Sequence, residues 1–179
     1  MVVRNTFIAL LLAFSSAPAL AQHQHGHAPA ASPYAGLETR ALKALSDEQV
    51  ADLKAGRGMG YALVAELNGY PGPSHVLELD EPLGLTDAQR SRMQALFRAM
   101  KAEAILIGER LIAQEADLDR QFAGRSVTPA SLTAATAAIG TTQAALRAAH
   151  LRYHLATMEI LTQEQVGHYK VLRGYSRVK

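Results

Sequence analysis

The sequence of 179 residues contains no cysteine and no tryptophan. The lack of cysteine excludes disulfide bonds, cysteine-ligated zinc sites and thiol nucleophiles. Aromatic residues make up only 6% of the chain, whereas alanine is abundant, which favours closely packed helices over a β-sandwich. Charge of either sign is also not in excess, since 18 Lys and Arg residues face 16 Asp and Glu residues. Proteins that bind nucleic acid usually concentrate a basic excess, so we expect no nucleic acid as a partner.

Long apolar runs are missing too, apart from one near the beginning of the chain. Residues 7–14 (FIALLLAF) follow Arg4, and residues 19–21 read ALA. A positive charge, a short apolar run and small residues in this order are typical of a cleaved secretory signal peptide. The run is too short to span a membrane as a helix, which takes roughly 20 residues. We therefore predict that residues 1–21 are a signal peptide and that the mature protein is periplasmic.

The segment after the predicted cleavage site has a different composition from the rest. Residues 22–33 combine alternating histidines with Ala, Pro and Ser, which predicts a disordered N-terminus. Residues 34–179 then have the length of a single domain.

One short motif occurs three times in this domain. It reads LSDEQ at 45–49, LTDAQ at 85–89 and LTQEQ at 161–165. Ser or Thr followed three residues later by Gln forms a capping box, in which the two side chains satisfy backbone N–H groups at the start of a helix. The motif therefore predicts three helix starts.

Long helices are predicted after the second copy. Apolar residues expected in a helix seam alternate at spacings of three and four from Met93 to Phe122, within a helix from Asp87 to Ala123, and again from Leu132 to Ile160. Thr128 followed by proline is a helix start. Two such helices joined by a short loop predict an antiparallel hairpin at 86–160. Short helices are expected within 46–79, separated by GRGMG and NGYPGP, and a final helix at 162–174. The predicted fold is all-α, and because one hairpin has little core of its own, we expect a dimer that buries a second face.

Two groups of residues are candidate metal ligands. His150 and His154 lie four residues apart, so a helix places both on one face, and Met158 continues that column. Imidazole and thioether side chains suit copper, and imidazole also suits zinc. The alternative is that these side chains are ordinary polar neighbours of the helix seam. His23, His25 and His27 form a second candidate, which is either a weak metal-binding tract or a solubilising tail.

Catalytic motifs are missing: there is no Gly-x-Ser-x-Gly, no His-Glu-x-x-His and no P-loop ending after GRGMG. We therefore predict that the protein is not an enzyme and that it requires no cofactor, with copper or zinc as the only candidate ions.

The two LTxxQ copies that flank the predicted hairpin, behind a signal peptide and without cysteine, resemble the Spy/CpxP family and the related ZraP and CnrX-like metal-resistance proteins. The resemblance covers roughly residues 74–175. It implies a homodimeric helical cradle that holds unfolded envelope proteins without ATP and, in some branches, binds zinc, copper or nickel. The matching residues would be structural and are Leu85, Thr86, Gln89, Leu161, Thr162 and Gln165.

Three functions follow as hypotheses. The first is a periplasmic ATP-independent chaperone that captures unfolded envelope proteins. The alternative is a periplasmic sensor or resistance protein for Cu, Zn or Ni. The third is an adaptor that docks on the periplasmic domain of a membrane sensor.

Overall fold

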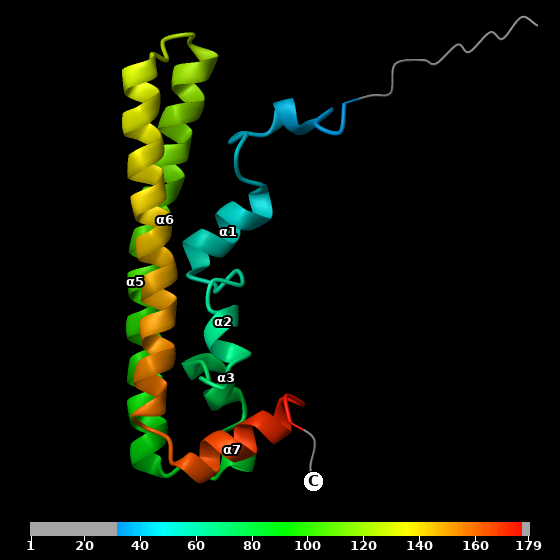
Figure 1. Ribbon diagram of the computed structural model, residues 1–179, viewed down its shortest axis with the longest axis vertical. Coiled ribbons are helices and arrows are strands. Elements are labelled where there is room, and N and C mark those ends of the chain that lie inside the picture. Colours follow the sequence, from blue (N-terminus) through cyan, green and yellow to red (C-terminus); the bar gives the residue numbers. More distant parts are fainter. Residues whose placement is uncertain (1–31, 177–179) are drawn as a thin grey trace, which may run out of the picture. The chain divides into compact units, whose positions relative to one another are not determined.

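The computed structural model describes residues 32–176, whose regular structure is entirely helical (Figure 1). This confirms the predicted fold class. The predicted signal peptide (1–21) and most of the predicted disordered segment (22–33) lie outside the described residues. The elements, in chain order, are the 3-10 helix η1 (Leu37–Thr39) and the α-helices α1 (Asp47–Ala55), α2 (Leu63–Glu66), α3 (Pro73–Glu78), α4 (Asp80–Leu83), α5 (Asp87–Ala123), α6 (Pro129–Met158) and α7 (Gln163–Leu172).

The antiparallel pair α5–α6 is the largest packing unit of the fold. Helix α5 has 37 residues, which corresponds to a length of about 55 Å. Thr86 caps α5 with the predicted capping box, and Thr128 is the N-cap of α6 as predicted, where Ser131 completes a capping box that the sequence analysis did not predict. Helix starts are therefore set by local hydrogen bonds, and the short loop between Ala123 and Pro129 makes the pair antiparallel.

The short helices lie along one side of this hairpin (Figure 1). Helices α1 and α3 pack against α5, and α2 packs against α6. The approach of α1 to α5 is close because Gly108 has no side chain: a Cβ atom there would lie 2.7 Å from the backbone oxygen of Leu53. Helix α7 begins beside the end of the hairpin at which α5 begins and α6 ends, and it runs away from the hairpin on the side of the short helices (Figure 1).

The core has two apolar clusters. One surrounds Leu53 and joins α1 to the middle of the hairpin; its other buried members are Ala104, Leu111, Ile139 and Leu146. The second lies at the end of the hairpin near α7 and contains Val76, Leu83, Leu85, Met93, Leu161, Val166 and Tyr169. The leucines of both LTxxQ copies thus belong to one cluster, which ties α7 to the start of α5.

The glutamines of these two copies also bind each other. The amide nitrogen of Gln89 donates to the side-chain oxygen of Gln165 at 2.8 Å and to the carbonyl of Ile160 at 2.9 Å. Each glutamine also closes its own capping box. Within the described residues, Gln49 of LSDEQ has hydrogen bonds only with Ser46. The second and third copies therefore position two helices against each other, while the first caps one.

Three local expectations need correction. Phe122 and Leu132 were expected in the hairpin seam, but both are exposed, because the short helices do not extend to the loop end of the hairpin. The helix expected over 61–67 is reduced to Leu63–Glu66. The short helix expected at 74–79 is present as α3, but the one-turn helix α4 that follows it and includes Pro82 was not predicted.

A candidate metal-binding cavity between the hairpin and the short helices

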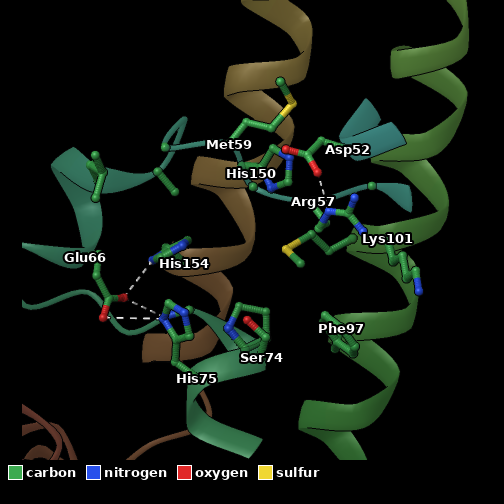
Figure 2. Close-up of a pocket in the computed structure, with 18 of the residues that line it drawn as sticks. Asp52, Arg57, Met59, Glu66, Ser74, His75, Phe97, Lys101, His150 and His154 are labelled. Carbon is green, nitrogen blue, oxygen red and sulfur yellow. Dashed lines mark hydrogen bonds and ion pairs between the residues drawn. The ribbon is translucent and has the colours of Figure 1, made fainter. Parts of the chain in front are cut away.

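A cavity of about 580 Å³ lies between the hairpin and residues 52–78 (Figure 2). Helix α6 contributes His150 and His154 to its wall, and α5 contributes Phe97, Met100 and Lys101. The opposite wall comes from α1, the GRGMG turn, α2 and the beginning of α3, and includes Asp52, Met59, Glu66, Gly72 and His75. Residues far apart in sequence therefore bring nitrogen, oxygen and sulfur donors to one cavity.

His154 has a defined tautomer. Its Nδ1 lies 2.7 Å from the carbonyl oxygen of Tyr70, which can only accept, so Nδ1 donates the proton and Nε2 carries the lone pair. Gly72 lies beside that lone pair, and a Cβ atom on this glycine would come within 2.9 Å of Nε2. Gly72 therefore packs closely against the ring edge that carries Nε2, where a larger residue would push the ring away.

His150 is almost fully buried, with 2% of its surface exposed. Tyr61 stacks on its ring at a centroid distance of 6.1 Å. Its Nε2 is buried and has no hydrogen-bond partner among the described residues. Burial, and then the charge of His154, lower the pKa of His150 against the opposing effect of Glu103. The ring is therefore neutral at neutral pH, and neutral imidazole is the form that binds metals.

Glu66 is the buried charge of this region, with 5% of its surface exposed. His75 Nδ1 lies 3.5 Å from its Oε1, and His154 Nδ1 lies 4.0 Å from its Oε2. Figure 2 shows both rings facing this carboxylate. The backbone N–H of Gly72 donates to Oε2 at 3.3 Å. Burial raises the pKa of Glu66, but hydrogen bonds from His75 and from two tyrosines, together with the charge of His75, outweigh it and lower the pKa to about 2.

The two tyrosines come from the C-terminal segment. Tyr169 of α7 donates its hydroxyl hydrogen to Oε1 of Glu66, and Tyr175 donates to the same atom at 3.1 Å. Arg173 Nε lies 3.7 Å from it. Burial, followed by the bond to the Glu66 carboxylate, raises the pKa of Tyr169. Glu66 therefore connects the cavity wall to α7.

The metal ligands predicted from the sequence are only partly brought together. His150 and His154 share one face of α6 and one cavity. The sequence indicated that they lie beside the helix seam, but not that residues 52–78 bury them. Met158 packs against the apolar cluster near α7 and is not part of the cavity wall. His23, His25 and His27 lie outside the described residues. The ligand assignment itself stays a prediction.

Glu66 and His75 were missed by the sequence analysis. A signal for Glu66 was present, because it is the only charged residue of the apolar stretch YALVAEL. Nothing local distinguishes His75, since its proximity to Glu66 arises when α3 folds back on α2.

The cavity has donor atoms that suit a metal ion, but they are not arranged to hold one. The unpartnered Nε2 of His150, the lone pair of His154 beside Gly72 and the nearby His75 and Glu66 are suitable donors for a borderline transition metal. Among residues 32–176, however, no three His, Asp or Glu side chains are already arranged to hold an ion. A third ligand would have to rotate into place, and the His75 side chain, 35% exposed, has the freedom to do so.

Comparison with known proteins gives one match. Residues 60–167, more than half of the chain, match the family model described as heavy-metal resistance. The match extends from the end of the GRGMG turn into α7 and so includes Glu66 and the three histidines of the cavity, His75, His150 and His154, but not Asp52. That family lies in the superfamily of the Spy/CpxP and ZraP-like proteins. Neither the curated proteins nor the solved structures contain a match to this chain. None of the helices within residues 32–176 is both long and apolar enough to cross a membrane.

Proposed function

Because this chain belongs to the heavy-metal resistance family, we propose that it is a periplasmic metal-binding protein that takes up a transition-metal ion in the cavity between the hairpin and residues 52–78. The periplasmic location is supported by the signal-peptide pattern of residues 1–21. The proposed activity is binding rather than catalysis, since the sequence carries no recognised catalytic motif.

The observation that carries this proposal is the buried, unpartnered Nε2 of His150 in the wall of the cavity. A buried polar atom without a partner costs about 1–3 kcal/mol, so a protein that retains one has a use for it. His154, one turn along α6, offers a second nitrogen at the same cavity. Two imidazoles four residues apart on one helix face are a frequent half of a metal site.

The residues around these histidines support the same role. The carbonyl of Tyr70 holds the His154 tautomer that leaves Nε2 free, and Glu66 faces Nδ1 of His75. A carboxylate or carbonyl behind a ligating imidazole fixes the ring and makes it a better ligand. His75 would complete the set as third ligand after rotation. Three imidazoles suit Zn(II), Cu(II) and Ni(II).

Isothermal titration of the mature chain with Zn(II), Cu(II) and Ni(II) tests the proposal. The N-terminal tract is first removed as a competitor by the triple change of His23, His25 and His27 to Ala. In that background, His150→Ala combined with His154→Ala should weaken binding by at least about 100-fold, since each lost ligand costs severalfold or more. His168→Ala is the matched control, because His168 is exposed on α7. Equal affinity for the double variant and the control would refute the cavity as the binding site.

A second candidate function is the capture of unfolded envelope proteins. Helix α2 and its C-cap residue expose three apolar side chains, which are Leu63 (56% exposed), Val64 (51%) and Leu67 (62%). Closely spaced exposed apolar side chains are typical of interaction surfaces. The test is light scattering of an aggregating client with the purified protein, in EDTA and in Zn(II). Suppression in EDTA that is lost in a variant with Leu63→Ser and Leu67→Ser would support capture; no suppression in either condition would refute it.

The assembly and partners expected from the sequence remain proposals of the same kind. A homodimer would cover part of the exposed apolar surface of α2, and sedimentation of the purified protein tests it. A membrane sensor's periplasmic domain is the other proposed partner.

A further inference from the structure

Two cationic side chains lie in the wall of the cavity with free hydrogen-bond donors. They are Arg57 of the GRGMG turn and Lys101 of α5, and Figure 2 shows the Arg57 guanidinium between His150 and Lys101. Arg57 Nε binds Asp52, but the two terminal nitrogen atoms of Arg57 have no hydrogen-bond partner among the described residues. Lys101 forms no ion pair within residues 32–176. Asp52 therefore fixes the guanidinium while its outer edge stays free to bind an anion.

The wall beside these cations is apolar. Phe97 and Met100 of α5 and Met59 of the turn all line the cavity. Leu63 also lines it although this side chain is 56% exposed, and its Cδ1 would lie 3.4 Å from a Cβ atom at Gly60. Sites for small molecules are cavities of this size, with apolar walls and a few polar groups that fix the orientation of the ligand.

The acidic side chains of the wall leave a positive charge near Arg57. Asp52 is paired with Arg57, so that Lys101 contributes one uncompensated charge there. Glu66 accepts hydrogen bonds from two tyrosines, and Figure 2 shows it on the side of the cavity away from Lys101. Glu78 is exposed on α3, where water screens it. One positive charge matches a monoanion.

We propose that this cavity binds a small apolar molecule that carries one carboxylate. The carboxylate would bind the terminal nitrogen atoms of Arg57, and the apolar part would lie against Phe97, Met100 and Leu63. Arginine binds carboxylates through two parallel N–H groups, which a lysine cannot reproduce. The carboxylate belongs either to a free carboxylic acid or to the last residue of a peptide, since both present the same group. The inference goes beyond the proposed metal binding and does not depend on it.

The proposal is tested by titrating the purified protein with octanoate, hexanoate and the uncharged octanamide, in EDTA. Methyl resonances in the nuclear magnetic resonance spectrum report binding, and those of Met59, Met100 and Leu63 should shift. Octanoate should bind at least about fivefold more tightly than hexanoate, because each buried methylene group strengthens binding about three- to fourfold. Octanamide should bind at least about tenfold more weakly than octanoate, because the charge-assisted hydrogen bonds are lost.

Substitutions of Arg57 locate the carboxylate. Arg57→Gln should weaken octanoate binding at least about tenfold, and Arg57→Lys at least about threefold, since lysine keeps the charge but not the paired donors. Arg57→Gln combined with Asp52→Asn should bind as weakly as Arg57→Gln alone, which shows that repulsion by an unpaired Asp52 is not the cause. Arg147→Gln is the matched control, because Arg147 is exposed on α6 and does not line the cavity. Circular dichroism verifies that each variant is folded.

A short peptide ending in Leu-Phe, as free acid and as amide, separates the two sources of the carboxylate. Arg57-dependent binding of the peptide acid without octanoate assigns the site to a chain end, and the reverse assigns it to a free acid; either result supports the proposal. The proposal is overturned if both acids fail to bind at millimolar concentration, if octanamide binds as tightly as octanoate, or if Arg57→Gln binds like Arg147→Gln. Since EDTA is present throughout, these outcomes leave the proposed metal binding untouched, and failure of metal binding leaves this site untouched.

Discussion

The contact between α1 and α5 leads to a quantitative prediction at Gly108. A Cβ atom at this position would lie 2.7 Å from the oxygen, 3.1 Å from the carbonyl carbon and 3.2 Å from the Cβ of Leu53. Carbon atoms pack favourably at about 3.5–4.0 Å. The two nearest obstructing atoms are backbone, and the third is a Cβ atom attached directly to the backbone, so none can rotate away. Gly108→Ala must therefore push α1 outward and disturb the apolar cluster in which Leu53 is 2% exposed.

The magnitude is best expressed as a difference between two variants. Gly140 lies in α6 with no heavy atom within 4 Å of a hypothetical Cβ. Gly140→Ala should therefore stabilise the protein by about 1 kcal/mol, the helix propensity difference between the two residues. Gly108→Ala gains the same propensity term but adds an overpacking cost of about 1–3 kcal/mol. The free energies of unfolding of the two variants should thus differ by about 1–3 kcal/mol, with Gly108→Ala the less stable.

Urea unfolding followed by far-ultraviolet circular dichroism measures both free energies. Hydrogen exchange in residues 47–55 then shows whether the loss is located in α1. If both substitutions stabilise the protein equally, α1 does not lie against α5 as the structure has it, and the cavity that α1 helps to form would lose its basis.

Three further outcomes are expected. The charged form of Glu66 is favoured on folding, with its pKa lowered from 4.5 to about 2, so its stabilisation is present above pH 4.5 and is lost as pH falls toward 2. At about 1.4 kcal/mol per pKa unit, the stabilisation by Glu66 amounts to about 3 kcal/mol. The urea midpoint should therefore fall more steeply from pH 6 to pH 2 for wild type than for Glu66→Gln. Parallel pH curves for the two proteins would contradict this stabilisation. Gln165→Ala should cost about 2 kcal/mol, because it breaks a cap and a part-buried amide pair. Gln49→Ala should cost no more than about 1 kcal/mol, because it breaks a cap alone. Equal losses in chemical unfolding would argue against the amide pair. Gly72→Ala should weaken metal binding at least about tenfold, because the new Cβ atom would come within 2.9 Å of His154 Nε2. Gly58→Ala is the control and should leave the affinity unchanged, since nothing lies within 4 Å of its new Cβ atom. Equal affinities of the two variants in a titration would exclude metal binding at His154 Nε2.

The long helices could be predicted because their signals are local. Thr86, Thr128 and Thr162 each accept a hydrogen bond from an N–H group three residues ahead, and that geometry is readable in the sequence. The end of α5 at Ala123 agrees with the end of its apolar periodicity. A capping box does not reveal a second partner, however. The pairing of Gln89 with Gln165 crosses 76 positions and became visible only when the two helices were placed.

The candidate site was predictable in part for the same reason. The spacing of His150 and His154 places both on one face of a helix whatever surrounds it. Which surface covers that face depends on α2 and α3, where glycine, proline and a helix of only four residues give no strong periodic signal. Burial of both histidines, and the position of Glu66 behind His75, could not be derived from the spacing.

The sequence by itself determined where the principal helices begin, that α5 and α6 run antiparallel, and which face of α6 carries both histidines. These properties depend on hydrogen bonds and side-chain contacts over three or four residues. The tertiary structure decided that this face lines a cavity and is connected to α7. The contacts responsible join Tyr70 to His154 across 84 positions and Glu66 to Tyr169 across 103. Such contacts depend on shape and charge between elements that meet only in the folded chain, which no pattern within a single element encodes.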